Sequence, residues 1–76
     1  RLRGLVSTIN EADSSFDIQG VTISVQDGIT AFEDDDDNVL SQNEFFNLLA
    51  VGDVVSARWD VFSSTSSVAD EVAIED

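Results

Sequence analysis

Oxygen-bearing side chains are the groups in this sequence whose types and spacing suggest chemistry. Asp34, Asp36 and Asn38 follow a D-x-D-x-N spacing, and Glu44 lies a few residues further along the chain. Carboxylate and amide oxygens at alternate positions of a turning loop suit a hard cation such as calcium, which takes about six to eight oxygen ligands. These four residues are therefore the candidate metal ligands, within an acidic loop at 33–44.

The spacing differs from that of an EF-hand loop at two decisive positions. Val39 stands where the turn glycine is required, and Phe45 stands where the last carboxylate ligand is required. The alternative is a solvated acidic loop that attracts counterions without a defined geometry, since the consecutive acids at 33–37 repel one another. Both interpretations stay open, and no cofactor other than calcium is expected.

Residue types that most catalytic sites require are missing from the chain. It contains no histidine, lysine or cysteine, and nucleophilic triads and transition-metal catalysis depend on these residues. Two carboxylates alone can hydrolyse a glycoside, but they must flank a substrate cleft, for which a chain of 76 residues has little room. We therefore expect that the protein is not an enzyme.

The charge balance argues against two classes of partner. Sixteen acidic and three basic residues give a formal net charge of −13. A nucleic-acid binder neutralises phosphates with clustered lysine and arginine, and anionic membrane surfaces attract the same residues. We expect neither partner, and no apolar stretch is long enough for this segment to insert directly into a membrane.

Size and composition predict a single domain. The 76 residues, of which 42% are hydrophobic, form one core and no more. We therefore expect one domain over 1–76. The chain begins with Arg1 instead of methionine, which we interpret as a fragment of a longer protein.

Alternating apolar and polar residues predict a mainly β domain. The clearest alternation is at 21–26, where Val21, Ile23 and Val25 are expected to face the core. Gly20 predicts a tight hairpin turn before it. The parity of the first strand changes along its length, which predicts a bulge. Strands are expected at 2–9, 16–19, 21–26, 29–32, 55–61 and 72–74, where 29–32 is either a second hairpin strand or a glycine-kinked continuation of 21–26.

One short helix is predicted after the acidic loop. Ser41 and Glu44 form a capping box, and the stripe of Phe45, Leu48 and Leu49 is expected to be buried. Gly52 is expected to be the C-cap glycine, and the following Asp53 is expected to accept hydrogen bonds from nearby backbone amides.

The aromatic residues divide into a predicted core set and a predicted surface set. Phe16, Phe45 and Trp59 fall at inward positions of the expected elements. Phe46 and Phe62 fall outside these stripes. We expect them to form an exposed apolar patch where a neighbouring domain docks.

The order of elements favours a small barrel. Five strands with the helix between the third and the fourth is the chain order of an OB-type barrel, and closure would remove exposed sheet edges. The predicted fold is therefore a five-stranded OB-like barrel with one short helix between strands 3 and 4. An open, twisted sheet with the helix on one face is the structural alternative.

Four segments give the chain a resemblance to a bacterial family of exported domains of unknown function. They are GVTISV at 20–25, TAF at 30–32, LAVGDVV at 49–55 and VADEV at 68–72. The resemblance implies small β-barrel modules, often in tandem copies and often behind a lipoprotein signal. It carries over no catalytic residue, and the acidic loop is an elaboration beyond the family pattern.

The resemblance implies a function and a location as well. We expect a non-catalytic structural or binding module that is periplasmic, at the cell surface or secreted, with any lipid anchor on an upstream segment. Its partners would be neighbouring domains of the same chain or another exported protein. Calcium binding by the acidic loop is the alternative function. Recognition of an oligosaccharide or oligonucleotide on the barrel face is the weaker alternative.

Overall fold

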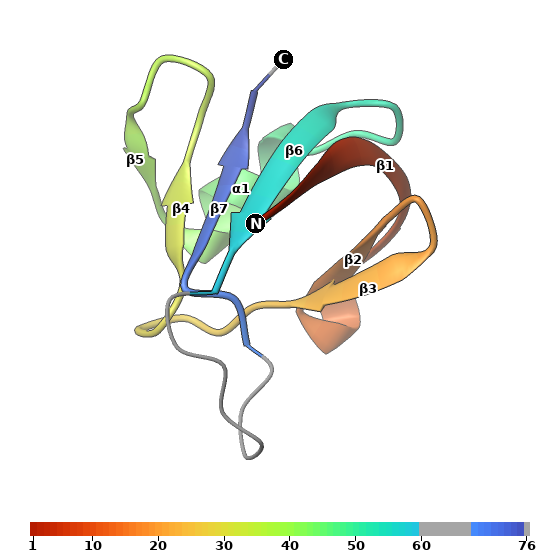
Figure 1. The fold of residues 1–76 in the computed structure, drawn as a ribbon. Coiled ribbons are helices and arrows are strands. Elements are labelled where there is room, and N and C mark those ends of the chain that lie inside the picture. Colours follow the sequence, from red (N-terminus) through yellow and green to blue (C-terminus); the bar gives the residue numbers. More distant parts are fainter. Residues whose placement is uncertain (60–67, 76) are drawn as a thin grey trace.

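Seven strands, one short α-helix and one 3₁₀ turn make up the part of the chain that the computed structural model describes, residues 1–59 and 68–75 (Figure 1). In chain order these elements are β1 (Leu2–Asn10), η1 (Glu11–Asp13), β2 (Ser15–Ile18), β3 (Val21–Ser24), β4 (Ala31–Glu33), β5 (Val39–Leu40), α1 (Gln42–Leu48), β6 (Val54–Arg58) and β7 (Glu71–Ile74). The mainly β class that the sequence predicts is confirmed.

The strands form one mixed sheet in the order β3-β2-β1-β6-β7-β4-β5. Neighbouring strands are antiparallel except β4 and β7, which are parallel. The sheet is open, so the closed barrel of the sequence prediction is not confirmed. A single parallel bridge between Ser24 and Val68 links the end of β3 to the segment before β7.

The strand count differs from the expected five at two places, because β4 is separate from β3 and because β5 lies within the predicted acidic loop at 33–44. β3 pairs with β2, and β4 pairs with β5 and β7, so β3 and β4 form neither a hairpin nor one continuous strand. The chain turns between them, where the backbone amide of Thr30 donates to the carbonyl of Gln26 at 2.9 Å. The buried Thr30 hydroxyl accepts from the Gln26 amide and donates to the Ala69 carbonyl at 2.7 Å. This turn carries Asp27 to the surface beside the helix.

Two local predictions for the first three strands are confirmed. The β2–β3 hairpin turns at Gln19 and Gly20, whose φ angles are 49° and 86°, and positive φ at both central residues defines the turn type that matches the twist of a hairpin. The register of β1 against β2 shifts between Val6 and Thr8, as a bulge requires.

The helix begins as the sequence predicts and ends earlier. The Ser41 hydroxyl accepts from the Glu44 amide, and the Glu44 carboxylate accepts from the Ser41 amide at 2.8 Å, which completes the capping box. Leu49 is the C-cap in an extended conformation, so the prediction of Gly52 as the C-cap is wrong. Gly52 has a φ of 97° in the turn before β6. Asp53 accepts from the Ala50 amide at 2.9 Å, as expected.

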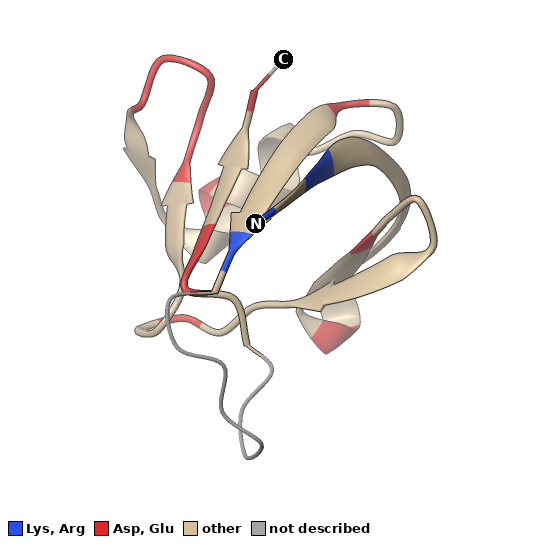
Figure 2. Cartoon of the chain, viewed as in Figure 1, with Lys and Arg blue, Asp and Glu red and all other residues tan. Residues whose placement is uncertain are grey.

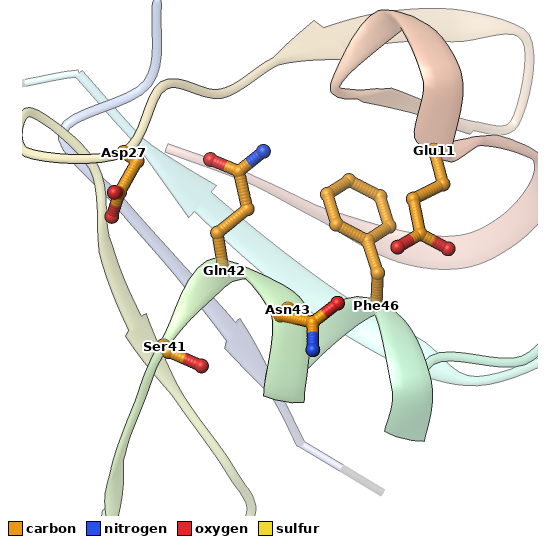
Figure 3. A pocket seen from close by; sticks show the side chains of 6 residues that line it. All are labelled: Glu11, Asp27, Ser41, Gln42, Asn43 and Phe46. Atoms are coloured by element: carbon orange, nitrogen blue, oxygen red, sulfur yellow. The ribbon is translucent and has the colours of Figure 1, made fainter.

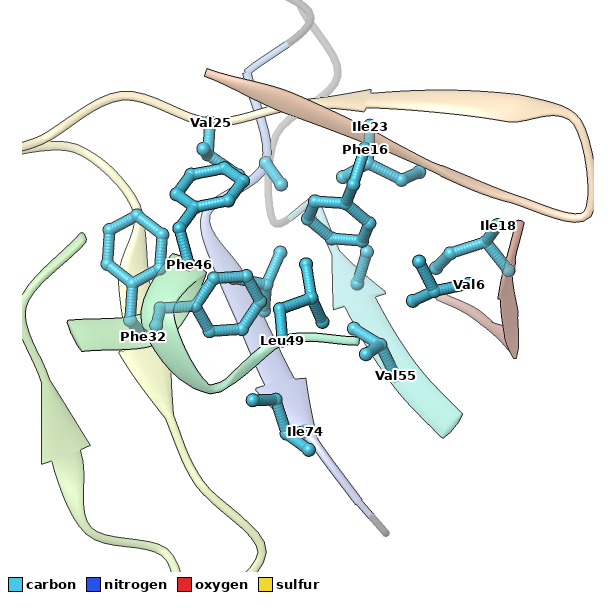
Figure 4. Close-up of a cluster of buried hydrophobic side chains, with 14 residues drawn as sticks. Val6, Phe16, Ile18, Ile23, Val25, Phe32, Phe46, Leu49, Val55 and Ile74 are labelled. Atoms are coloured by element: carbon cyan, nitrogen blue, oxygen red, sulfur yellow. The ribbon is translucent and has the colours of Figure 1, made fainter. Parts of the chain in front are cut away.

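Four phenylalanine rings form the centre of the core, between the helix and the sheet (Figure 4). The Phe45 ring lies 5.2 Å from that of Phe32, 5.6 Å from that of Phe46 and 5.7 Å from that of Phe16, measured between centroids. Aliphatic side chains from the strands surround these rings. The buried apolar residues are Val6, Phe16, Ile18, Ile23, Val25, Phe32, Phe45, Phe46, Leu49, Val55, Ala57, Ala69, Val72 and Ile74.

Three sequence predictions about this core are wrong. Phe46 is buried, whereas Leu48 is 57% exposed, so the expected positions of these two helix residues are reversed. Helical periodicity alone allows either residue beside Phe45 and Leu49, and the direction from which the sheet approaches decides between them. Val21 is 51% exposed, because it lies at the start of the edge strand β3. Trp59 is half-buried against the core, and Phe62 lies outside the described residues.

The buried position of Phe46 and the exposed position of Leu48 provide a direct test of the helix orientation. We expect Phe46→Ala to lower the free energy of unfolding by about 3 kcal/mol or more, because it removes a buried ring and leaves a cavity. The matched variant Leu48→Ala should change it by only about 0.5 kcal/mol, because the side chain is largely in water. Urea denaturation measures both, and the milder Phe46→Leu serves if Phe46→Ala does not fold. A larger loss for Leu48→Ala than for the Phe46 variants would contradict the orientation.

Candidate functional site

The acidic loop between β4 and β5 is closed by one of its own carboxylates. Asp34 accepts hydrogen bonds through Oδ1 from the backbone amides of Asp36 and Asn38, each at 2.9 Å. Its Oδ2 accepts from the Asn38 side-chain amide at 3.0 Å. These hydrogen bonds hold the pKa of Asp34 below its usual value. The bond from the Asn38 side chain makes the largest contribution. The first of the predicted calcium ligands is therefore already bonded within the loop.

Glu44, the last of the predicted ligands, is engaged in a different contact. The carboxylate of Glu44 belongs to the capping box of α1, where it accepts from the Ser41 amide. Among residues 1–59 and 68–75, no three acidic side chains gather in a position to hold a metal ion. The calcium hypothesis for Asp34, Asp36, Asn38 and Glu44 stays a prediction, and the carboxylates of Asp34 and Glu44 already accept hydrogen bonds within the chain.

A hollow of about 250 Å³ lies between the acidic loop and the end of β7. It is lined by Asp34, Asp35, Asp37, Ala73, Ile74 and Glu75. Figure 2 shows, in red, the run of acidic residues along the loop next to this strand. Part of the negative charge is compensated there, because Arg3 Nε lies 2.7 Å and Arg1 Nη2 lies 3.1 Å from the Glu75 carboxylate.

Glu75 connects the three strands β1, β6 and β7. It accepts from Arg3 on β1 and from the Ser56 hydroxyl on β6 at 2.9 Å, and it directly follows β7. The hydrogen bond from Arg3, followed by that from Ser56, holds the pKa of Glu75 below its usual value. Its ionised form therefore stabilises the fold.

Glu33 at the end of β4 is in the opposite electrostatic situation. Partial burial, and then the negative charges of Glu71 and Asp37, raise the pKa of Glu33 above its usual value. Arg58 Nε lies 3.5 Å from a Glu71 oxygen, which offsets the repulsion only in part. The ionised form of Glu33 therefore destabilises the fold.

A second pocket, of about 340 Å³, lies at the start of α1 (Figure 3). Three separate segments build it. Glu11 comes from η1, Asp27 from the turn after β3, and the remaining residues from the helix and its N-cap. Those remaining residues are Ser41, Gln42, Asn43 and Phe46. The two carboxylates lie on opposite sides of Gln42 and Phe46 in the close-up.

Backbone and core contacts hold these three segments in place. The Gln42 side-chain amide donates to the hydroxyl of Ser14 at 2.9 Å, which joins the helix to the residue after η1. The carbonyl of Ser14 accepts from the Val25 amide at 3.0 Å, which joins the same residue to the chain leading into the Asp27 turn. Phe46 is fixed by its edge-on contacts with the rings of Phe45 and Phe16. The pocket is therefore part of the folded scaffold.

The pocket presents hydrogen-bond acceptors without matching positive charge. Among the described residues, the carboxylates of Glu11 and Asp27 have neither an ion pair nor a hydrogen bond. All three arginines of the chain lie against acids near β7 instead. Sequence reasoning missed this pocket, because its residues are separated along the chain and follow no motif.

The fold and the two pockets define a small acidic β-sheet domain with one capped helix and polar hollows on its surface. The chain belongs to the family of the domain of unknown function DUF5666, whose family model matches residues 3–73. No curated protein and no solved structure matches the chain. The expected membership in a family of unknown function is confirmed. The described residues contain no helix with the length and apolar character needed to cross a membrane.

Two single-carboxylate changes test the electrostatic assignment. We expect Glu75→Gln to lower stability at neutral pH, because a carboxylate with a lowered pKa stabilises the fold above about pH 4.5, its unfolded value, and loses that effect as the pH falls through its folded value. Glu33→Gln should raise stability at neutral pH. A carboxyl with a raised pKa stabilises the fold only while protonated, and this effect is lost as the pH rises through its folded value.

Thermal unfolding of the wild type and both variants between about pH 3 and pH 8, a range that spans the usual carboxyl pKa, measures the two effects, because glutamine does not titrate there. The difference between each variant and the wild type should shrink toward acid pH. Both variants remove one negative charge. If both raised stability at neutral pH, or both lowered it, the opposite roles assigned to Glu75 and Glu33 would be contradicted, and the change would reflect net charge alone.

Proposed function

We propose that this domain is a non-catalytic structural or binding module of an exported bacterial protein. The chemistry of its surface hollows carries the proposal. Carboxylates and apolar groups line both of them, and a hydroxyl and two amides are added in the pocket at the start of α1. The whole chain lacks histidine, lysine and cysteine. These groups can bind a ligand, but they provide no activated nucleophile with a matched base.

The resemblance to exported modules supports the location and the partners that we propose. The domain would act outside the cytoplasm, in the periplasm, at the cell surface or after secretion, next to other copies or other domains. A high negative charge keeps such a domain soluble and separates it from nucleic acids and anionic membranes. We propose that it works without a metal or cofactor.

Glycan or oligonucleotide recognition is less well supported. Such surfaces use aromatic rings as stacking platforms. Four of the five phenylalanines are buried, at Phe16, Phe32, Phe45 and Phe46, and Trp59 is half-buried. Few rings are therefore available for stacking among the described residues.

We also propose that the sheet closes toward the OB-like barrel of the sequence prediction. The parallel bridge between Ser24 and Val68 supports closure, together with the hydrogen bond from the Ala69 amide to the Ser24 carbonyl at 3.0 Å. Both contacts join the β3 edge of the sheet to the segment that leads into β7.

The absence of catalysis is testable with a substrate panel. We expect the purified domain to hydrolyse aryl esters, aryl phosphates and aryl glycosides no faster than buffer does, because no activated nucleophile is available. Chromogenic release measures this. Turnover that Glu11→Gln and Asp27→Asn abolish and Asp35→Asn retains would identify a catalytic carboxylate pair and overturn the proposal.

A calcium titration tests the alternative function. We expect the midpoint of thermal unfolding to stay unchanged in millimolar calcium, compared with magnesium at the same ionic strength, because a ligand of the native state must raise it. A rise that a chelator reverses would establish a site, if Asp36→Asn abolishes it and Asp35→Asn does not. Neither of these side chains closes the loop, so both variants should keep its backbone geometry.

A further inference from the structure

We propose that Asp27 is a site of spontaneous backbone modification, at which the aspartyl linkage to Gly28 isomerises to an isoaspartyl linkage in the folded protein. The two residues lie in the turn between β3 and β4. Water is the only other reactant. The proposal goes beyond the function as a binding module and does not depend on it.

The reaction is an intramolecular acylation followed by hydrolysis. The backbone nitrogen of Gly28 attacks Cγ of the protonated Asp27 carboxyl, a bond forms between these two atoms, and the hydroxyl leaves with the amide hydrogen as water. Water then adds to one of the two carbonyl carbons of the resulting five-membered succinimide. Opening at Cγ restores aspartate, and opening at the main-chain carbon leaves Gly28 joined to Cγ, which is isoaspartate. One water leaves and one enters, so the mass is unchanged and no oxidant or reductant is required.

Both reacting groups are accessible in this turn. Asp27 and Gly28 are exposed. Among the described residues, no hydrogen bond or ion pair engages the Asp27 carboxylate or the Gly28 amide. A Cβ atom added at position 28 would meet no other heavy atom within 4 Å, so no neighbouring group blocks the approach of the two atoms.

The peptide unit between Asp27 and Gly28 can rotate without the loss of a hydrogen bond. The Ile29 amide donates to the Gln26 carbonyl at 3.1 Å and Gly28 has a φ of 86°, which is typical of a type II turn. Types I and II differ by a flip of the central peptide unit, and glycine at the third position accepts both. Neither the N–H nor the C=O of this unit is bonded within the described ranges. Its rotation moves the nitrogen toward Cγ.

The base of the turn is held while its tip is free. The Thr30 hydroxyl accepts from the Gln26 amide at 3.0 Å and donates to the Ala69 carbonyl at 2.7 Å. The Thr30 amide donates to the Gln26 carbonyl at 2.9 Å. The tip can therefore rotate while the flanking strands stay in place. Isoaspartate adds one carbon to the main chain inside this closed turn, so we expect the product to weaken the bonds that end on Gln26.

Asp13, which precedes the small residue Ser14, provides an internal comparison. Its carboxylate accepts from the Asn10 side-chain amide at 2.8 Å, and the Ser14 amide donates to the Glu11 carbonyl at 3.0 Å. Both groups that would react at this position are therefore engaged, and the reaction requires local opening first. We expect the fold to protect Asp13 and to leave Asp27 unprotected.

Prolonged incubation of the purified domain at neutral pH, in buffer and in urea that unfolds it, tests the proposal. Cleavage after glutamate releases the fragment 12–33, which contains both Asp13 and Asp27, and electron-transfer dissociation distinguishes the two linkages. We expect isoaspartate at Asp27 to form in buffer within about threefold of its rate in urea, because no bond must open first. At Asp13 it should form about tenfold or more slowly in buffer than in urea.

Two variants at position 27 control for the chemistry. Asp27→Glu keeps the formal charge of −13, but its cyclisation would need a six-membered ring, so we expect no isomer at this position. Asp27→Asn should form the same succinimide with loss of ammonia, which mass spectrometry detects as conversion to aspartate and isoaspartate. The NMR spectrum of each fresh variant verifies its fold.

Three results would overturn the proposal. They are protection of Asp27 in buffer by about tenfold or more, equal rates at Asp13 and Asp27 in buffer, and no isoaspartate at Asp27 in either sample. The first two would show that the reaction passes through unfolding instead of through the folded turn. The third would show that this linkage does not react.

Discussion

The burial of Phe45 between the sheet and the other aromatic rings is the interaction on which the rest of the structure depends. A helix of seven residues does not survive alone in water. It persists because Phe45 and Phe46 pack into the sheet against Phe16 and Phe32, and because the capping box at Ser41 satisfies its first amides. In a domain this small, few other contacts could replace that cluster.

The same cluster positions the surface features. Phe46 forms part of the wall of the pocket at the start of α1 and is held from below by the neighbouring rings. The acidic loop connects β4 to β5, and Leu40 of β5 packs against the core. The packing of the core therefore determines the positions of the pocket and of the acidic loop. A change in the orientation of the helix would move Phe46 and Gln42 away from the other residues that line the pocket.

Charge is distributed unevenly over this scaffold. All three arginines lie against Glu71 or Glu75, so the few positive charges stabilise the strands around β7. Among the described residues, no ion pair joins an arginine to the acids of the loop or of the helix side, although Arg58 partly offsets the repulsion at Glu33. This division explains why one hollow is partly neutralised and the other is not.

The sequence by itself determined the elements that depend on neighbouring residues. The hairpin turn at Gly20, the capping box of Ser41 and Glu44, and the bulge in the first strand follow from local chemistry and short periodicity. Only the tertiary structure decided the choice between Phe46 and Leu48, the separation of β3 from β4, and the meeting of Glu11, Asp27 and Gln42. These features depend on which surfaces approach each other across long sequence separations, and no local pattern specifies that approach.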